Sequence, residues 1–461
     1  MNKTVEKWID DHREEMVAAL QKCISFRTVR DTDSAGPGVP FGPELKECLD
    51  HILRTADTMG LESKNLDGYC GYAQFGSGEE QLGIFVHLDV VPEGDGWIHP
   101  PYSGKIDGPW LYGRGALDDK GPAVAALYAM AAVKSAGLPA RRSVRLILGC
   151  DEESQMACLR HYKQVEPLPD LAFSPDAQYP LVNCEKAIYG AVYQKAFSSQ
   201  LSLQAGTVSN AVPDKAVCRC YLSADAVSHA AQTVLNGSPF HWRCQKAEKD
   251  TLLTISGKAA HASTPEEGHN ALCAMLAVLK QLPLSKEDAD TAAGLADVLQ
   301  YDHHGESFGL DCADASGRLT LNAGVINWNE SGIQRLSVDI RAPISAEESV
   351  ITEKLQAGFS KSGLCEERHS YSPGYRVDPD SELIRSLITV YHTHLDPGGE
   401  PLSIGGGTYA RHLKNAVAFG PERPGEEAPI HMANERILID HFIEDAKIYA
   451  DAIIALACTA E

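Results

Sequence analysis

Three short apolar runs, each followed closely by an acidic or imidazole side chain, restrict the fold of this chain more than any other feature. The runs are LGIFV at 82–86, SVRLILG at 143–149 and LAFS at 171–174. Continuous apolar runs of this length are typical of strands buried on both faces of a parallel sheet. A helical pattern at 122–137, which begins at Pro122, lies between the first two runs. The sequence therefore predicts an α/β fold around a mostly parallel sheet.

The side chains that follow these runs are candidates for a binding site. Parallel strands present their carboxyl ends at one edge of a sheet, and ligands bind beyond that edge. The candidates just beyond the three runs are His87, Asp89, Asp151, Glu152, Glu153 and Asp176. The sequence thus predicts a cluster of carboxylate and imidazole groups at one edge of the sheet.

The pattern changes after about residue 186. From Gln334 to Arg341 apolar and polar residues alternate, which indicates an antiparallel sheet with one exposed face. Further strands are predicted at 188–197, 217–223, 251–257 and 320–326, and helices at 269–280 and 346–361. A stretch with proline and glycine then predicts a return to the first domain. We therefore expect one domain formed by 1–186 and 376–461, and an inserted α+β domain at 187–375.

An excess of acidic residues limits the partners of this chain. Lys and Arg number 41 and Asp and Glu number 63, which gives a net charge of −22. A chain with this charge repels phosphate backbones, so we expect no nucleic-acid partner. The most apolar long stretch, 123–138, contains Lys134 and is too short to span a bilayer. Residues 1–16 lack the apolar core of a signal peptide, so we expect no membrane association.

The cysteines indicate a reducing compartment. Thirteen of them are scattered from Cys23 to Cys458, and none forms a Cys-x-x-Cys pair. This pattern is typical neither of a disulfide framework nor of a thiolate zinc site. We interpret them as reduced, mostly buried residues of a cytoplasmic protein.

Five segments carry side chains from which a metal centre can be built. They are HLDVVPEGDGW at 87–97, GRGALDDKGP at 113–122, DEES at 151–154, SPDAQYP at 174–180 and PIHMANE at 429–435. Taken alone, each has an ordinary alternative as a surface turn, a helix N-cap or a solvated loop. Together they offer five nitrogen and oxygen ligands, which are His87, Asp118, Glu153, Asp176 and His431.

The number and type of these ligands indicate the metal. Nitrogen and oxygen ligands without thiolates suit Zn²⁺, with Mn²⁺ or Co²⁺ as alternatives. Five ligands are too many for one catalytic zinc ion that keeps an open coordination position, and they suit two metal ions that share one carboxylate. Glu152 is then left over as a candidate general base.

The motifs resemble those of the co-catalytic zinc peptidase family that contains aminoacylase, glutamate-releasing carboxypeptidases and the bacterial PepV-type dipeptidases. The resemblance is strongest to the PepV-type dipeptidases. Besides the five segments above, it rests on NAVPDKA at 210–216, HASTPEEGHNA at 261–271, DIRAPI at 339–344 and GGGTYAR at 405–411. It implies a zinc-peptidase-like catalytic domain, made of the two outer parts of the chain, and an inserted lid domain of two α+β units.

The resemblance also implies how the ligands share two zinc ions. One ion is held by His87, Asp118 and Asp176. The other is held by Asp118, Glu153 and His431, so that Asp118 bridges the two ions. The peptide bond between Asp118 and Asp119 is cis in the family. Asp89 orients His87, and Glu152 is the general base that activates a water between the two zinc ions.

Other positions are matched to substrate binding by the same resemblance. His261 of the inserted domain would reach the carbonyl of the peptide bond, and Asn210 would contact the substrate nearby. The substrate carboxylate would be bound by Arg341 and by the loop residues Gly406, Gly407 and Thr408. These residues also have ordinary alternatives, as a surface histidine, a strand ion pair and a glycine turn. The second α+β unit would fill the space of a partner subunit, so we expect a monomer.

We therefore predict a cytoplasmic metal-dependent hydrolase that cleaves the peptide bond of dipeptides, with two Zn²⁺ per chain and a small dipeptide as its partner. Two alternatives use the same core, an N-acyl-amino-acid amidohydrolase and a carboxypeptidase. A third is a catalytically inactive metal-binding or interaction protein. Loss of Glu152 or of a ligand would have favoured the third, but every expected position carries the expected residue.

Overall fold

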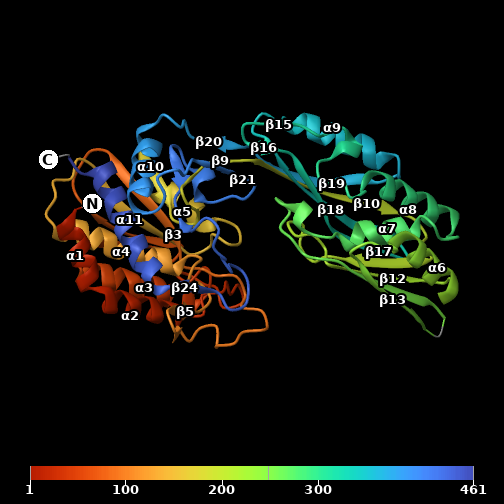
Figure 1. Cartoon of the computed structure of the whole chain (residues 1–461), viewed down its shortest axis with the longest axis horizontal. Coiled ribbons are helices and arrows are strands. Elements are labelled where there is room, and N and C mark those ends of the chain that lie inside the picture. Colours follow the sequence, from red (N-terminus) through yellow and green to blue (C-terminus); the bar gives the residue numbers. More distant parts are fainter. Residues whose placement is uncertain (1, 248, 460–461) are drawn as a thin grey trace. The chain divides into compact units, whose positions relative to one another are not determined.

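The structure, a computed structural model, describes residues 2–247 and 249–459, and the chain divides into two compact units (Figure 1). The first unit consists of Met1–Asn183, Val377–Leu402 and Gly407–Glu461, and the second of Cys184–Arg376 and Ser403–Gly406. The short segment 403–406 thus belongs to the second unit, whereas the predicted insert was a single stretch.

The first unit is built on a mixed sheet that runs in the order β1-β2-β6-β3-β7-β22-β9-β20, with β21 paired to β9. The residues of β20, most of β21 and half of β9 are assigned to the second unit. Its strands are β1 (Glu62–Leu66), β2 (Cys70–Phe75), β6 (Ser143–Gly149), β3 (Gln81–His87), β7 (Leu171–Ser174), β22 (Ala416–Ala418), β9 (Val182–Glu185), β20 (Tyr375–Arg376) and β21 (Leu402–Ile404). The pairs β6-β3, β3-β7 and β7-β22 are parallel, and the outer pairs β1-β2, β2-β6, β22-β9 and β9-β20 are antiparallel. The three apolar runs form β3, β6 and β7, so the predicted parallel sheet is found at the centre, with antiparallel strands on both sides.

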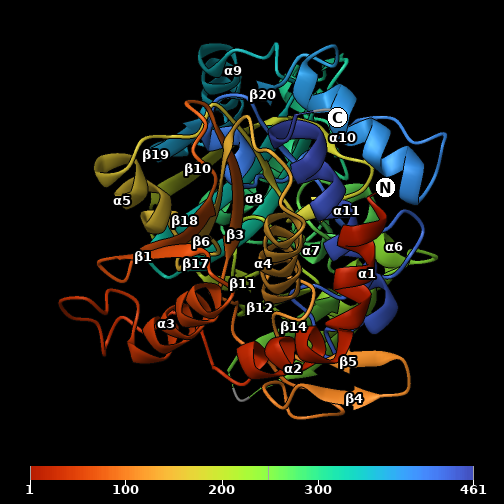
Figure 2. The ribbon, with the colours of Figure 1, turned by 90° about the vertical axis from the view of Figure 1, so that its left-hand side faces the viewer.

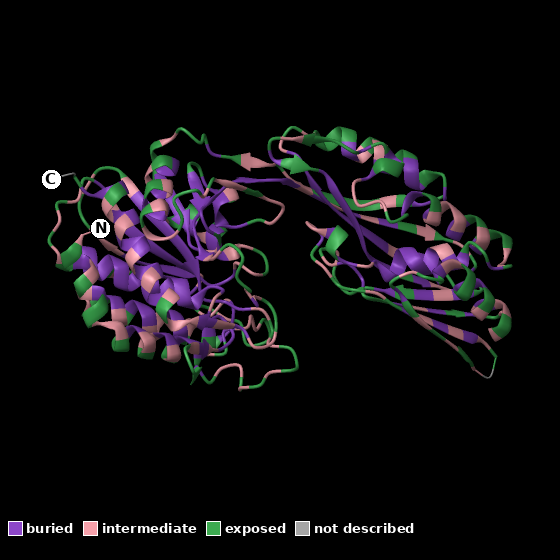
Figure 3. Ribbon diagram, in the orientation of Figure 1, coloured by how far each residue is buried: buried purple, intermediate pink, exposed green. Residues whose placement is uncertain are grey.

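Helices cover this sheet. They are α1 (Lys3–Asp11), α2 (Arg13–Ile24), α3 (Pro43–Thr58), α4 (Lys120–Ser135), α5 (Ala157–Val165), α10 (Glu382–His394) and α11 (Ile439–Ala457). Figure 2 shows α4 beside α1 and α11, and α4 also contacts α2 and β3. Helix α4 is rich in alanine, whose small side chain allows close packing on every side, and it is buried from Lys120 to Val133 (Figure 3). The residues that precede α4 are therefore held firmly by the core.

Two small sheets lie outside the main sheet of the first unit. One contains β4 (Lys105–Asp107), β5 (Trp110–Tyr112) and β24 (Arg436–Leu438). The other pairs β8 (Ala177–Gln178) in parallel with β23 (Pro421–Glu422). A short helix, η3 (Tyr409–His412), precedes β22. The pair of β8 and β23 ties the loops that follow β7 and β22 to each other.

The second unit is built on an eight-stranded antiparallel sheet in the order β13-β14-β12-β11-β17-β18-β10-β19. Its strands are β13 (His241–Lys246), β14 (Thr251–Ser256), β12 (Lys215–Cys220), β11 (Leu201–Ala205), β17 (Thr320–Asn329), β18 (Gly332–Ala342), β10 (Ala187–Ala196) and β19 (Cys365–Ser372). The helices are α6 (Ala224–Leu235), α7 (Ala271–Leu279), α8 (Lys286–Val298) and α9 (Glu348–Ser360). Short elements complete the unit, namely η1 (Pro265–Glu267), η2 (Glu306–Phe308), β15 (Ala313–Asp314) and β16 (Gly317–Arg318).

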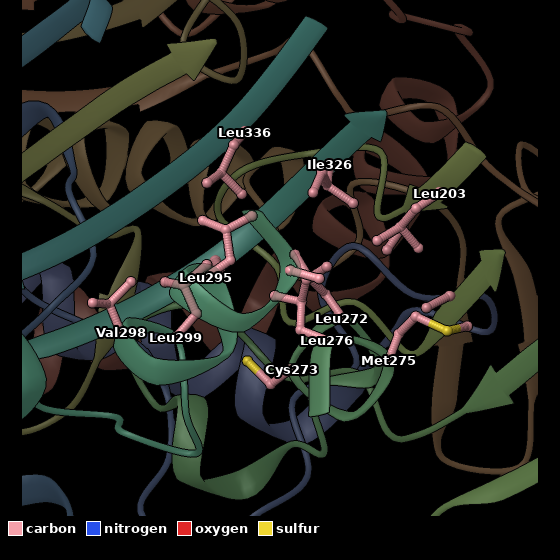
Figure 4. Close-up of a cluster of buried hydrophobic side chains, with 14 of the residues drawn as sticks. Leu203, Leu272, Cys273, Met275, Leu276, Leu295, Val298, Leu299, Ile326 and Leu336 are labelled. Carbon is pink, nitrogen blue, oxygen red and sulfur yellow. The ribbon is translucent and has the colours of Figure 1, made fainter. Parts of the chain in front are cut away.

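The apolar core of the second unit lies between the helices and one face of this sheet. Figure 4 shows Leu272 and Leu276 of α7 beside Ile326 of β17, with further apolar side chains around them. Along β10, buried Tyr189 and Tyr193 alternate with half-buried residues, so the other face of the sheet is more open. The antiparallel sheet that the alternation at 334–341 predicted is confirmed. The predicted exposed face of that segment is not found, because Ser337, Asp339 and Arg341 are all buried.

The strands of the second unit fall into two groups of four, joined where β11 pairs with β17. One apolar cluster contains residues of both groups, for example Leu253 of β14 and Ile340 of β18. The description of the insert as two α+β units stays a prediction. No helix in the part of the chain that the structure describes is both long enough and apolar enough to cross a membrane.

Candidate metal centre

The five predicted ligands come together at one edge of the first unit's sheet. His87 is the last residue of β3, Glu153 follows β6, and Asp176 follows β7. Because these three strands are parallel neighbours, their carboxyl ends meet at the same edge. Asp118 lies just before α4, and His431 lies in the loop before β24. The strand-end positions thus explain why side chains far apart in the sequence become neighbours.

Asp118 lies between the two histidines. Its Oδ1 is 3.0 Å from Nε2 of His87, and its Oδ2 is 3.0 Å from Nε2 of His431. Nε2 of His431 is also 2.9 Å from Oε1 of Glu153, and Nε2 of His87 is 3.8 Å from Oδ2 of Asp176. Each carboxylate oxygen of Asp118 therefore faces a different imidazole, which is the arrangement that a bridging ligand requires.

Two groups of side chains place their ligand atoms within 4.8 Å of one another. One contains His87, Asp118 and Glu153, and the other contains His87, Glu152 and Asp176. The second group was not expected, because the sequence analysis left Glu152 out of the ligand set. Glu152 is thus close enough to the other groups to reach a metal ion, and its role as the base stays a prediction.

The hydrogen bonds around His87 suit a metal ligand. Nδ1 donates to the backbone carbonyl of Asp89 (2.9 Å), which leaves the lone pair of Nε2 directed at the carboxylates. Oδ1 of Asp118 is buried and accepts no hydrogen bond from the described residues, although Nε2 of His87 lies near it. A cation between these two electron-rich atoms would satisfy both, so the residues present fit a metal ion.

The pKa values at this edge reflect crowded charges. Burial, followed by the neighbouring Asp176 carboxylate, raises the pKa of Glu152 well above its usual value. Burial works against the charged form of His431, but Asp118 and Glu153 outweigh it and raise the pKa of His431 to about 11. Burial also opposes ionisation of Asp118, but the two histidines lower its pKa. The carboxylates thus create a strongly negative site, which favours divalent cations.

Asp89 supports the site through backbone contacts. Its Oδ1 accepts a hydrogen bond from the backbone N–H of Glu152 (3.1 Å), and its Oδ2 accepts one from that of Glu153 (3.0 Å). The carbonyl of Asp89 also receives the hydrogen bond from His87. Asp89 thus fixes the ring of His87 at the end of β3 and the backbone of Glu152 and Glu153 just after β6.

Two buried carboxylates that had no role in the sequence analysis hold the segment around Asp118. Asp119 accepts a hydrogen bond from the backbone N–H of His87 (3.0 Å), and the peptide bond between Asp118 and Asp119 is cis, as the resemblance implied. Glu435 accepts hydrogen bonds from the backbone N–H groups of Leu117 (3.0 Å) and Asp118 (3.2 Å). Both residues occur in motifs that were singled out, but nothing in the motifs shows which groups they contact.

Asp151 has a different function from its neighbours. It is buried, lies 3.4 Å from the guanidinium of Arg30, and accepts a hydrogen bond from the backbone N–H of Ala157 (2.9 Å). These contacts anchor the loop between β6 and α5. Asp151 was a candidate because it follows a strand, but it does not belong to either group of ligand atoms.

The predicted substrate-binding residues lie mainly in the second unit. His261 is exposed, and its Nδ1 is 2.7 Å from Oγ of Ser263. Asn210 is also exposed, and its carbonyl accepts a hydrogen bond from the backbone N–H of Ala262 (2.9 Å), so the two predicted residues lie on adjacent segments. How these residues act on a substrate stays a prediction.

Arg341 is buried and already paired. Its Nε lies 2.7 Å from Oδ1 of Asp339, its Nη2 lies 3.2 Å from Oδ2, and its Nη1 donates to the carbonyl of Gly405 (2.6 Å). Gly406 belongs to the second unit, whereas Gly407 and Thr408 belong to the first, where Thr408 accepts a hydrogen bond from the backbone N–H of Ala410 (3.1 Å). Arg341 could therefore bind a substrate carboxylate only through guanidinium N–H groups that are not already bonded to Asp339 or Gly405.

Comparison with known proteins identifies what this chain is similar to. A family model described as Peptidase family M20/M25/M40 matches residues 83–455. The chain is 35% identical to "Putative dipeptidase YtjP" of Bacillus subtilis over 456 residues, which cover 96% of this chain and 98% of the relative. It is 28% identical to the "Beta-Ala-Xaa dipeptidase" of Lactobacillus delbrueckii subsp. lactis, with 99% of each chain covered.

Solved structures share the fold. Human carnosine dipeptidase 1 matches with a TM-score of 0.55 at 18% identity and covers 99% of each chain. An aminoacylhistidine dipeptidase from Vibrio alginolyticus matches with a TM-score of 0.55 at 15% identity and covers 96% of each chain. At these identities the likeness concerns the fold, a catalytic domain with an inserted α+β lid domain, and this predicted fold class is confirmed.

Proposed function

Because this chain belongs to peptidase family M20/M25/M40, we propose that it is a metal-dependent dipeptidase whose metal centre is built from His87, Asp118, Glu153, Asp176 and His431. The observation that carries the proposal is the position of Asp118, whose two oxygens face the two histidines at 3.0 Å each. The names of the relatives in Bacillus and Lactobacillus support a dipeptide substrate.

The family implies a divalent metal cofactor, and we propose two Zn²⁺ ions per chain, with Mn²⁺ or Co²⁺ as substitutes. The donor atoms are imidazole nitrogens and carboxylate oxygens, which all these ions accept. One ion would be held by His87, Asp118 and Asp176, and the other by Asp118, Glu153 and His431. When bound, such ions make a water more acidic and polarise the substrate carbonyl.

Glu152 is the proposed general base. It accepts a proton from the attacking water and later gives it to the leaving amine. The backbone of Glu152 is fixed by its hydrogen bond to Asp89, so its side chain starts from a defined position beside Asp176. Burial raises the pKa of Glu152, which makes its carboxylate a stronger base than that of an exposed glutamate.

The second unit supplies the proposed substrate contacts. The imidazole of His261 would donate a hydrogen bond to the carbonyl oxygen as negative charge develops on it. Arg341 and the loop of Gly406, Gly407 and Thr408 would hold the substrate carboxylate, and Asn210 would contact the substrate beside the carbonyl. Such contacts require a substrate with a free carboxylate, which a dipeptide carries.

We also propose a cytoplasmic monomer. The support for the compartment is that all thirteen cysteines, which lie in the described part of the chain, are free and eleven of them are at least partly buried. The support for the monomer is the large sheet of the second unit, whose two groups of strands would replace the contribution of a partner subunit.

A substrate panel tests the proposal. The metal-loaded enzyme is assayed on dipeptides, on N-acetyl amino acids and on longer peptides, before and after removal of metal with a chelator. We expect turnover of dipeptides only, no turnover after chelation, and recovery with Zn²⁺, Mn²⁺ or Co²⁺. Preference for N-acetyl amino acids would favour an amidohydrolase, and full activity of protein shown by elemental analysis to be metal-free would refute the metal centre.

A further inference from the structure

Arg114 and Glu435 form a buried ion pair in the first unit, and neither belongs to the ligand set or is the proposed base. Nη1 of Arg114 lies 2.7 Å from Oε2 of Glu435, and both side chains are at most 2% exposed. Arg114 follows β5, and Glu435 directly precedes β24, which pairs with β5. The backbone N–H of Gly113 donates to the carbonyl of Glu435 (2.9 Å), so the register of this small sheet brings the pair together.

The pair is bonded to two segments that carry metal ligands. Asp118 lies four residues after Arg114, and the residue four positions before Glu435 is His431. Oε1 of Glu435 accepts hydrogen bonds from the backbone N–H of Asp118 (3.2 Å) and from that of the preceding residue (3.0 Å). Nη1 of Arg114 also donates to the carbonyl of Met432 (3.2 Å), the residue after His431. One ion pair thus connects both ligand segments.

The segment of His431 requires contacts of this kind. His431 is exposed, and its φ of 58° lies in the left-handed region, which residues with a Cβ atom rarely adopt. Such a conformation persists only where the surrounding structure holds it. The hydrogen bond from Arg114 to Met432 supplies such a contact directly beside the ligand.

The other edge of the guanidinium holds the loop that follows β3. Nη2 of Arg114 donates to the carbonyls of Pro92 (3.3 Å) and Glu93 (3.4 Å). The guanidinium also lies over the ring of Trp97, 5.4 Å from its centroid. A planar guanidinium can donate in several directions at once, whereas a lysine ammonium at the same position acts as a single point of contact.

The two proposed metal ions depend on this pair to different degrees. The ion held by Asp118, Glu153 and His431, named the His431 ion below, takes two of its three ligands from segments bonded to the pair. The ion held by His87, Asp118 and Asp176, named the His87 ion, takes only Asp118 from them. His87 ends β3 and Asp176 follows β7, so the main sheet positions both.

We propose that Arg114 and Glu435 are positioning residues that set the affinity for the His431 ion, and that the His87 ion binds largely without them. This inference rests on the proposed function, because it requires a centre that holds two ions. The pair acts through the backbone of the two ligand segments. Its loss should therefore leave a centre that binds one ion tightly and the other weakly.

The test counts the ions bound per chain as free metal is raised. Wild-type protein and Arg114→Lys are stripped of metal and equilibrated with Zn²⁺ that is buffered by a competing chelator. The lysine keeps the charge but not the planar arrangement of donors. We expect one Zn²⁺ to bind Arg114→Lys with nearly the wild-type affinity and the other to bind roughly 10–100-fold more weakly. Turnover of a dipeptide should return at saturating Zn²⁺, because all ligands are still present.

Double variants identify which ion is weakened. Asp176→Ala removes a ligand of the His87 ion, so Arg114→Lys combined with it should bind neither ion tightly. Glu153→Ala removes a ligand of the His431 ion, so the same combination with Glu153→Ala should still bind one. The opposite pattern would assign the effect to the His87 ion and overturn the inference. Two changes that act on one ion are not additive, whereas changes that act on separate ions are.

The matched control is Arg145→Lys. Arg145 is also buried, with Nη1 2.9 Å from Glu166 and Nη2 2.7 Å from the side-chain oxygen of Gln74. This variant should lower the thermal unfolding temperature as Arg114→Lys does, but it should bind both ions like the wild type. If Arg114→Lys does not fold, Glu435→Asp takes its place. It keeps the charge on a side chain too short to reach both the guanidinium and the backbone.

The outcomes separate the inference from the function on which it rests. If the wild-type protein binds fewer than two Zn²⁺ ions, the proposed metal centre fails. If it binds two, and Arg114→Lys also binds both with unchanged affinity, the inference is overturned. Equal weakening of both ions would overturn it as well, and so would the same loss of metal in Arg145→Lys, which would indicate a general loss of stability.

Discussion

The metal centre of the first unit and the predicted catalytic contact of the second unit are supported in different ways. His87, Asp89 and Asp118 are buried, Glu152 and Glu153 are half-buried, and Asp89 accepts hydrogen bonds from the backbone N–H groups of these two glutamates. His261 lies on an exposed turn, where its ring contacts Ser263 two residues away. The first arrangement is built by the core of the fold, whereas the second depends on a local turn.

This difference indicates how the work of the enzyme is divided. A metal centre requires its ligands at fixed positions, because coordination distances tolerate little variation. A residue that meets the substrate from another unit must be able to approach and withdraw as substrate enters and product leaves. We therefore expect substitutions around the metal centre to act through metal binding or chemistry, and substitutions at the exposed turn to act on turnover while the metal stays bound.

The largest effect is expected from Glu152→Ala. Removing a general acid–base group costs roughly 10²–10⁴-fold in kcat. Elemental analysis should find the metal content unchanged, whereas the matched variant Glu153→Ala should lose metal. Near wild-type turnover of Glu152→Ala would show that the base is another group. Loss of metal from it would show instead that the grouping of Glu152 with His87 and Asp176 reflects metal binding.

A smaller effect is expected from His261→Ala, since it would remove only the hydrogen bond that we propose to the developing oxyanion. Such a loss costs roughly 10²–10³-fold in kcat. The metal content and the thermal stability should not change, because the side chain is exposed. A drop in metal content would contradict the division between the two regions.

Mixing two inactive variants shows whether His261 acts within its own chain. In a monomer, a mixture of His261→Ala and Glu152→Ala stays inactive, because every active site carries one of the two defects. If activity returned on mixing, His261 would have to act across subunits, and the monomer proposal would be abandoned. Size-exclusion chromatography of each variant provides the control for the oligomeric state.

The sequence was informative where function depends on local position. Strand ends are visible in the sequence, so the positions that bring His87, Glu153 and Asp176 to one edge could be predicted. The contact between Arg114 and Glu435 (2.7 Å) joins residues 321 positions apart, and only the fold brings them together.

The elements of the second unit show the same limit. The sequence predicted five of its eight strands, which are β10, β12, β14, β17 and β18, and missed β11, β13 and β19. Helices α6 and α8 were missed, although both have a serine N-cap, Ser223 and Ser285, whose side chain accepts a backbone hydrogen bond. The assignment of the segment 403–406 to the second unit depends on contacts such as that between Arg341 and Gly405, which no sequence pattern shows.

Asp89→Asn tests the support of the metal centre, with an effect smaller than that of the catalytic variants. The amide can accept only at its oxygen, so one of the two backbone N–H groups of Glu152 and Glu153 loses its acceptor. Displacement of a group that supports metal ligands typically costs 10–100-fold in metal affinity. We expect this loss in a titration against a competing chelator, with most of the activity restored at saturating metal. An unchanged metal affinity would show that the backbone of Glu152 and Glu153 is held in place without Asp89.

Ser263→Ala is the counterpart on the exposed turn and should have the smallest effect. The hydroxyl of Ser263 is 2.7 Å from Nδ1 of His261, and a single hydrogen bond of this kind contributes about 0.5–1.5 kcal/mol, which corresponds to at most roughly a tenfold change in kcat. Metal affinity should stay at the wild-type value, in contrast to Asp89→Asn. The serine side chain is half-buried, so Ser263→Thr, which keeps the hydroxyl, serves as the control for packing. If Ser263→Ala lowered kcat as much as His261→Ala does, the turn would have to be regarded as a rigid part of the active site, and the difference between the two regions would disappear.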